Sequence, residues 1–292
     1  MTMQMRRFND PAQKRRLRRG LHILPSLFTT ANIALGYFAI NQTMLATPAE
    51  AWRFDNAAKA IGIAIVADFM DGMIARLTHT ASDFGRELDS LADVITFGVA
   101  PAMLAWMWGF RWLPLGDWAD WRARLIQIGA ITSFLFLIAG ASRLARFNIQ
   151  KNPQPSNPGR PDRKYFVGMP IPAGAGVIAA VVHFSAGRPL DTWWLSTIWA
   201  ALLVTVGYLM VSTWRYVSLK GLDWRKRVPF RTVILIAALI GGIYFFSRYV
   251  LFLLGLTYML SGVLARLQWI FRRKSAPPPP SPPPSYEEAP QA

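Results

Sequence analysis

The stretch LIQIGAITSFLFLIAGAS, residues 125–142, contains no Asp, Glu, Lys, Arg or His. Residues 192–214 share this property. An apolar stretch of about 20 residues matches the hydrocarbon thickness of a bilayer, whereas a helix in a soluble core rarely stays apolar on every face for that length. Both stretches therefore predict transmembrane helices and a polytopic membrane protein.

The composition of the chain favours the same fold class. Charged residues make up 16% of the 292 residues, whereas an ordinary soluble domain carries about 25%. We expect an all-α polytopic membrane protein of about eight transmembrane helices, the first six of which form one bundle. The expected spans are 22–45, 56–77, 88–110, 125–147, 171–186, 192–214 and, within the apolar stretch 232–270, two helices separated by a hairpin near Gly241-Gly242 and Ser247-Arg248.

The net charge of +16 is compatible with nucleic-acid binding, but its placement favours a membrane topology. Lys and Arg gather at the basic tail 6–19, in the segments 151–164 and 220–227, and at 272–274. These segments alternate with less basic ones, as the positive-inside rule expects, and anionic headgroups would attract them. We therefore predict a cell-membrane protein, in a bacterial cytoplasmic membrane, with both termini in the cytoplasm and no nucleic-acid partner.

The chain divides into four predicted regions. They are a basic N-terminal segment (1–20), a membrane domain (21–230), a C-terminal transmembrane hairpin (231–274) and a disordered proline-rich tail (275–292). The tail contains the run PPPPSPPPS, which cannot bury an apolar face. The chain has no cysteine, which excludes disulfides and thiolate chemistry.

The stretch ADFMDGMIARLTHTASDFGRELDSLAD, residues 67–93, carries the candidate chemistry. Asp68 and Asp71 are three residues apart and share one helix face. Asp89 and Asp93 are four residues apart on the helix that follows. If the two helices are antiparallel, the four carboxylates meet near the cytoplasmic surface of the membrane.

Four aspartates in membrane helices require a physical reason, because each costs about 2.5–3.5 kcal/mol on insertion scales. Like charges at close range repel unless protons or cations neutralise them. Oxygen ligands without His or Cys favour a hard divalent cation: Mg²⁺, Mn²⁺ or Ca²⁺. Two cations held by shared carboxylates suit displacement at phosphorus, and a divalent-cation transporter is the alternative from another class.

Residues between the aspartates suit a phosphate ligand. Gly72 and Gly85 lack a Cβ and would let a bulky ligand approach the helix backbone. Arg76 could bind phosphate oxygens with its guanidinium fork, or form a structural ion pair. The spacing D-x-x-D-G-x-x-A-R-x8-G-x3-D-x3-D is met at every position by Asp68, Asp71, Gly72, Ala75, Arg76, Gly85, Asp89 and Asp93.

This pattern resembles the signature of the CDP-alcohol phosphatidyltransferase family. The resemblance implies that a CDP-linked lipid binds with its pyrophosphate at two metal ions, an alcohol attacks the lipid-side phosphorus, and CMP leaves. It also implies that all four aspartates ligate metal, and that Asp93 is the general base. Asp68 would also contact the CDP-lipid. The resemblance places Gly72, Ala75, Arg76 and Gly85 at the CDP site.

Further stretches resemble the phosphatidylserine synthase branch of this family. They are DSLADVITFGVAPA (89–102), RLARFN (143–148), FVGMPIPAGA (166–175), VSTWRY (211–216), and the spaced set Thr29, Asn32 and Gly36. The branch implies CDP-diacylglycerol and L-serine as substrates, and the family implies a homodimer. Glycerol phosphate, inositol phosphate and choline remain alternative acceptors.

The sequence says less about the binding site of the acceptor alcohol than about the metal and CDP sites. Arg143 and Arg146 are candidates for binding the serine carboxylate, although they could instead bind lipid phosphates. Asn32 could contact the nucleotide or lipid, or form a hydrogen bond between helices. His22, His79 and His183 are scattered along the chain, and we expect no catalytic role for them.

Overall fold

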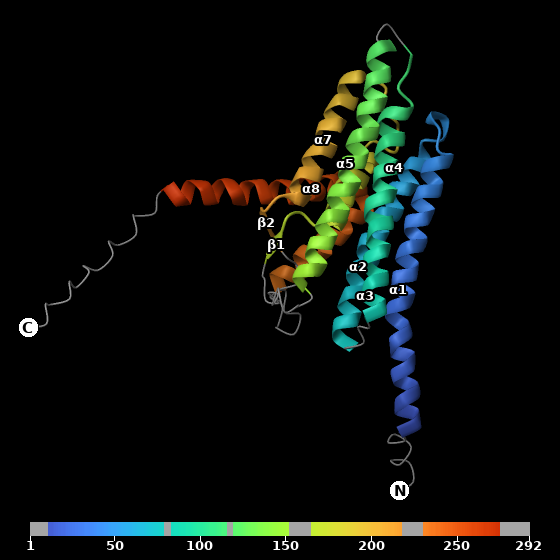
Figure 1. Cartoon of the computed structure of the whole chain (residues 1–292), viewed down its shortest axis with the longest axis vertical. Coiled ribbons are helices and arrows are strands. Elements are labelled where there is room, and N and C mark those ends of the chain that lie inside the picture. The colour runs from blue at the N-terminus through green and yellow to red at the C-terminus, as the bar shows by residue number, and fades with distance from the viewer. Residues whose placement is uncertain (1–10, 79–82, 116–118, 152–164, 218–229, 275–292) are drawn as a thin grey trace, which may run out of the picture.

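A computed structural model of the chain describes residues 11–78, 83–115, 119–151, 165–217 and 230–274. The described part is a helical bundle with one short strand pair (Figure 1). Its elements are α1 Pro11–Leu45, η2 Pro48–Glu50, α2 Trp52–Thr78, α3 Asp83–Asp93, η3 Val94–Val99, α4 Ala100–Trp106, η4 Met107–Arg111, α5 Ala119–Lys151, β1 Tyr165–Val167, α6 Ile171–Phe184, α7 Trp193–Val211, β2 Arg215–Val217 and α8 Phe230–Lys274.

The predicted all-α polytopic membrane fold is confirmed. Four described helices are long and apolar enough to cross a bilayer: 84–111, 120–149, 193–211 and 232–266. The helix α6 is apolar but shorter. The helices α1 and α2 do not meet the same hydropathy criterion, although they run along the bundle beside the others (Figure 1). Charged side chains such as Asp55, Lys59 and Asp68 lower the hydropathy of α2.

One rod of helix runs from α3 to η4 and contains two π-helical segments, η3 and η4. Pro101 lies in the first turn of α4, directly after η3. Proline has no N–H to donate to the preceding turn, and a wider π turn accommodates this loss. The rod therefore changes its helical register immediately after Asp93.

Small residues allow the helices of the bundle to approach closely. The buried face of α2 includes Ala57, Ala60 and Ala64. Their small side chains allow the α1 and α6 backbones to lie close to α2. A Cβ built on Gly109 would lie 2.2 Å from the ring of Trp199, whose indole N–H donates to the Ala105 carbonyl at 3.0 Å. The α4 region and α7 are thus joined by packing and by a hydrogen bond.

In the sequence, β1 lies between α5 and α6, and β2 lies between α7 and α8. The two strands pair in antiparallel orientation. Gly168 follows β1 with φ +79°, a conformation that favours glycine, and its N–H donates to the Trp214 carbonyl at 2.8 Å. This turn directs the chain into α6. The sequence FVGMPI therefore forms a strand, a tight turn and a helix start.

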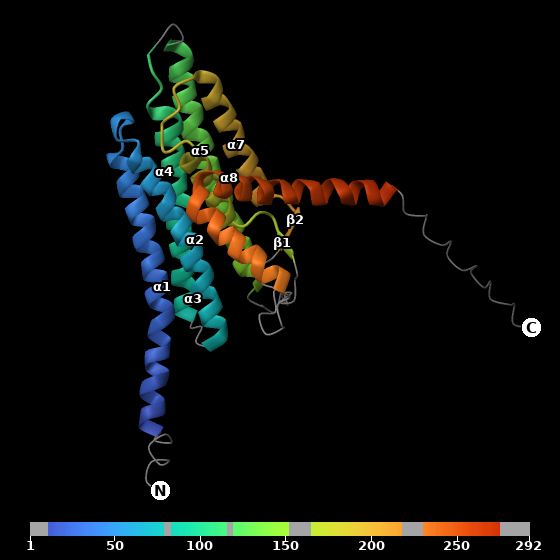
Figure 2. The ribbon, with the colours of Figure 1, turned by 180° about the vertical axis from the view of Figure 1, so that it is seen from behind.

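The helix α8 bends at Phe246, where φ is −133° and ψ 40° (Figure 2). The expected break near Ser247-Arg248 lies next to this bend, whereas Gly241 and Gly242 lie inside helix. After the bend, α8 runs across the bundle and not alongside it (Figures 1 and 2). The basic residues 1–10 and the proline-rich tail lie outside the described residues.

Candidate active site

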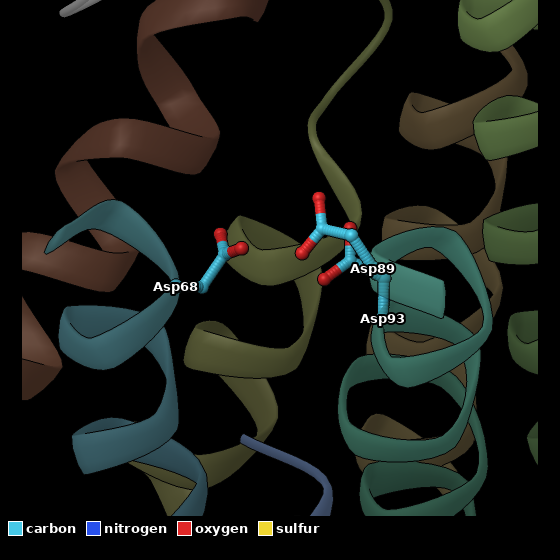
Figure 3. Close-up of side chains that lie close together, drawn as sticks. All are labelled: Asp68, Asp89 and Asp93. Atoms are coloured by element: carbon cyan, nitrogen blue, oxygen red, sulfur yellow. The ribbon is translucent and has the colours of Figure 1, made fainter. Parts of the chain in front are cut away.

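Three aspartates from two helices converge between α2 and α3 (Figure 3). Asp68 extends from α2, whereas Asp89 and Asp93 extend from successive turns of α3. Carboxylate oxygens of the three lie within 4.8 Å of one another, and the three side chains are half-buried. The structure thus brings together three of the four aspartates that the sequence suggests as metal ligands.

The fourth aspartate, Asp71, is held by α1. Its Oδ2 accepts a hydrogen bond from the Thr29 hydroxyl at 3.0 Å, and its side chain is buried. Within the described residues, its Oδ1 is buried and has no hydrogen-bond partner. Asp71 therefore lies one helical turn from Asp68 with one oxygen held by the protein and the other available to a ligand.

The backbone that follows Asp93 is also held by α1. Asp93 ends α3, and η3 begins at the next residue. The Thr96 hydroxyl in η3 donates to the Asn32 carbonyl at 3.0 Å. A Cβ on Gly36 would lie 2.5 Å from Thr96 Oγ1, so the two helices are in direct contact. Single π-helical turns are frequent at functional sites, where they orient a side chain.

Asn32 lies next to this contact with a buried side chain, 1% exposed. Its backbone carbonyl, and not its amide, forms the bond to Thr96. Neither amide atom has a hydrogen-bond partner within the described part of the chain. A buried amide without partners costs free energy, which favours contact with a ligand or water over an interhelical bond.

The other residues of the signature lie on the same two helices. Gly72 follows Asp71 on α2, and Gly85 precedes Asp89 by one turn on α3. Ala75 and Arg76 lie on α2, but their side chains are outside the described residues. These signature positions thus share the two helices that carry the aspartates.

The structure distinguishes the two acceptor candidates on α5. The Arg146 guanidinium donates to the carbonyls of Val211 and Met210 at 3.1 and 3.4 Å, and so closes the end of α7. Arg143 is buried, with its guanidinium 5.3 Å from the Phe147 ring, and it interacts electrostatically with Asp93. Of the two candidates, Arg143 is therefore the one that interacts electrostatically with an aspartate of the cluster.

Two of the stretches typical of the phosphatidylserine synthase branch are in contact. The Asn148 amide donates to the Ser90 hydroxyl at 2.8 Å, and this hydroxyl donates to the Arg86 carbonyl at 3.0 Å. Ser90 follows Asp89, so the bond connects the end of α5 to the aspartate helix. No role was predicted for Ser90, Asn148 or Thr29, although all three belong to stretches that resemble the phosphatidylserine synthase branch.

The carboxylate oxygens of the site suit a divalent cation as ligands. Hard cations bind oxygen at about 2.0–2.6 Å, so two ligands of one ion are separated by no more than roughly 5 Å. The oxygens of Asp68, Asp89 and Asp93 meet this condition without rearrangement. The buried, unpartnered Oδ1 of Asp71 adds a further oxygen one turn away. In the absence of a cation, the repulsion among the carboxylates would have to be reduced by protonation.

Comparison with known proteins agrees with this arrangement. The family model described as CDP-alcohol phosphatidyltransferase matches residues 22–206. A CDP-diacylglycerol–serine O-phosphatidyltransferase of Helicobacter pylori is 35% identical over 215 residues, which is 71% of this chain and 77% of the relative. Proteins with the same name from Bacillus subtilis (33% over 165 residues, 56% and 77%) and Methanocaldococcus jannaschii (35% over 161 residues, 55% and 63%) are also similar.

The family match covers more than half of the chain and contains every aspartate of the cluster. It ends before β2 and α8, which lie beyond residue 206. With the signature met at each position and its carboxylates gathered between α2 and α3, this chain belongs to the CDP-alcohol phosphatidyltransferase family.

Proposed function

We propose that this enzyme transfers the phosphatidyl group of CDP-diacylglycerol to the hydroxyl of L-serine and releases CMP. The arrangement that carries the proposal is the cluster of Asp68, Asp89 and Asp93 between two membrane helices. Three carboxylates this close in a membrane bundle repel one another unless cations or protons neutralise them. Membership of the family also disfavours the divalent-cation transporter.

In this reaction one bond forms and one breaks. The serine oxygen bonds to the lipid-side phosphorus, the bond from this phosphorus to the bridging oxygen of CDP breaks, and CMP leaves with the electron pair. Asp93 accepts the hydroxyl proton as general base. Asp68, Asp71, Asp89 and Asp93 would hold Mg²⁺ or Mn²⁺, with two ions per site, and the ions would offset the negative charge that develops on the pyrophosphate.

The assignment of serine rests on two kinds of support. The relatives are named for transfer to serine, and the branch-specific stretches at Ser90 and Asn148 contact each other next to Asp89. Serine carries a carboxylate, for which the guanidinium of Arg143 is a suitable partner beside Asp93. Arg146 contributes indirectly, because its bonds to the end of α7 position the same segment of α5.

The remaining signature residues would form the binding site for CDP-diacylglycerol. Gly72, Ala75, Arg76 and Gly85 would line the CDP moiety, and the unpartnered amide of Asn32 would bind the nucleotide or the lipid. The helix α3, which carries Asp89 and Asp93, lies in the half of the bundle toward the N-terminus of α1 (Figure 1). By the positive-inside rule, the basic N-terminal segment supports a cytoplasmic position for the termini and the site, and we expect the enzyme to be a homodimer.

The experiment is CMP release by purified protein with CDP-diacylglycerol and Mg²⁺ or Mn²⁺. L-serine is compared with glycerol 3-phosphate, inositol phosphate, choline and no acceptor. We expect release that depends on serine and on the metal. The Asp93→Asn variant should lose roughly 10²–10⁴-fold in rate, which is the usual contribution of a general base.

Asp191→Asn is the matched control, because Asp191 is exposed in the segment before α7 and far along the chain from the cluster. It should retain the wild-type rate. Release with another acceptor would contradict the assignment of serine, and full activity of Asp93→Asn would contradict the role of this carboxylate.

A further inference from the structure

The last turns of α5, which carry the candidate acceptor arginine Arg143, are attached to two neighbouring helices by polar side chains. The Arg146 guanidinium donates to two backbone carbonyls at the end of α7, at 3.1 and 3.4 Å. The Asn148 amide donates to the Ser90 hydroxyl of α3 at 2.8 Å. The end of α5 is therefore held on one side by α7 and on another by the helix that carries two of the clustered aspartates.

Ser90 lies between Asp89 and Asp93 in the sequence of α3. Its hydroxyl accepts the hydrogen bond from Asn148 and donates one to the Arg86 carbonyl, one turn earlier, at 3.0 Å. A hydroxyl that donates to its own helix has a fixed orientation, and its oxygen lone pairs remain available to a donor on another helix. Ser90 is thus oriented by α3 to accept a bond from α5.

The helix α3 has few other means of attachment to α5. It packs mainly against α1 and the segment η3 that continues it, and little of it contacts α5. The middle of α5 contacts η3 instead, where a Cβ on Gly98 would lie 2.9 Å from the Leu137 side chain. Because α1 holds α3 and η3 independently of α5, the Ser90–Asn148 bond determines where the end of α5 lies relative to the aspartates, and does not hold the aspartates themselves.

The position of Arg143 depends on this end of α5. Its side chain is buried, 6% exposed, and its guanidinium lies 5.3 Å from the ring of Phe147 on the same helix. A packed side chain has little freedom to compensate for a shift of its own backbone. A displacement of the last turns of α5 would therefore displace the guanidinium as well, and with it the interaction of Arg143 with Asp93.

We propose that Ser90 and Asn148 are positioning residues for the acceptor, because their hydrogen bond fixes the end of α5, with Arg143, beside the aspartate helix α3. This inference rests on the proposed transfer to serine, in which Arg143 binds the serine carboxylate. Attack requires the acceptor oxygen to lie about 3–3.5 Å from the phosphorus in the correct orientation, so a shift of roughly 1 Å in the group that holds serine affects the reaction. In this role neither Ser90 nor Asn148 touches the substrate.

The test compares CMP release by Ser90→Ala, Asn148→Leu and the double variant with that of the wild type. We expect the KM for L-serine to rise about three- to tenfold in each, the range for loss of one neutral hydrogen bond. The KM for CDP-diacylglycerol should be unchanged, because α1 still holds the aspartates. The double variant should match the single variants, since the second substitution has no bond left to remove. Ser90→Thr keeps the hydroxyl and should keep the wild-type KM.

Ser261→Ala is the matched control. Ser261 is a half-buried serine of α8 whose hydroxyl also donates to a carbonyl of its own helix, that of Tyr258, at 2.6 Å. Its replacement should leave both KM values unchanged.

Several results would overturn the inference. One is an unchanged KM for serine in Ser90→Ala, including the case in which it rises only in Asn148→Leu, because Asn148 would then act without Ser90. Another is a double variant in which the two single effects multiply, because the residues would then act independently. A rise in both KM values with a lowered melting temperature would indicate a structural role.

The outcome also separates this inference from the proposed function. If the wild type used another acceptor, transfer to serine would be contradicted, and the KM for that acceptor in the same variants would decide the positioning role. If the wild type used serine and Ser90→Ala behaved like Ser261→Ala, only the positioning role would be contradicted.

Discussion

At the scale of single residues, Thr29 shows how the protein holds a carboxylate beside the aspartate cluster. Its hydroxyl donates to Oδ2 of Asp71 and leaves Oδ1 without a partner in the described residues. Removal of a group that orients a metal ligand in this way typically lowers metal affinity or activity by about 10–100-fold.

We therefore expect Thr29→Val to raise the Mg²⁺ or Mn²⁺ concentration needed for half-maximal CMP release by about tenfold. Valine has nearly the shape of threonine but no hydroxyl, so Asp71 would lose its donor. Thr29→Ser retains the hydroxyl and is the control. The proposed role of Asp71 would be wrong if valine and serine gave the same metal dependence.

At the scale of the helices, close contact between α1 and η3 supports the backbone next to Asp93. A Cβ at Gly36 would meet both the hydroxyl and the Cα of Thr96, at 2.5 and 3.0 Å. The hydroxyl could turn away, but the Cα belongs to the backbone and cannot move independently. An added methyl group must therefore separate the two elements.

Gly36→Ala should lower stability by about 1–3 kcal/mol, the usual cost of overpacking. Gly62→Ala is the control on α2, since a Cβ there meets nothing within 4 Å and alanine is the better helix former. Thermal unfolding in detergent measures both variants. Equal melting temperatures would show that α1 and η3 adapt without cost.

A second contact between elements joins α2, α6 and α8 around a buried charge. Asp55 lies 2.5 Å from Nδ1 of His183 and 2.8 Å from the Lys59 ammonium, and His183 also reaches Ser247 beside the bend of α8. Both His183 and Asp55 are buried. The histidine for which we expected no catalytic role thus has a structural one.

Replacing His183 with Leu should cost about 3 kcal/mol, because Asp55 would remain buried with only one partner. Ser247→Ala removes one neutral hydrogen bond and should cost about 1 kcal/mol. The double variant with Asp55→Leu should recover much of the loss, since no buried charge is then left uncompensated. A double variant no more stable than His183→Leu alone would contradict the ion-pair explanation.

At the scale of the whole molecule, the distribution of basic residues predicts which side of the membrane faces the cytoplasm. The α1–α2 connection at η2 and the start of α3 lie toward opposite ends of the bundle (Figure 1). Because the chain has no cysteine, single introduced cysteines report topology without a background.

We expect Ala49→Cys to react with a membrane-impermeant maleimide in intact cells, and Glu87→Cys to react only after the membrane is permeabilised. Both positions are exposed. Labelling of Glu87→Cys in intact cells would place the active site on the outer side and contradict the positive-inside assignment.

Much of this protein was predictable from its sequence, because long apolar stretches and a strict spacing of polar residues are local properties. The stretch 125–142 is enough to predict a spanning helix. The spacing of Asp89 and Asp93 is enough to place them on one face of a helix, since a helix repeats every 3.6 residues.

The tertiary structure decided what depends on contacts between distant segments. It separated Asp71 from the other aspartates through Thr29, directed Arg146 to the end of α7 and left Arg143 near Asp93. It also bent α8 at Phe246 and packed Tyr258 of α8 against Tyr216 of β2. These pairings join residues far apart in sequence, and local periodicity carries no information about which helix faces meet once the chain has folded.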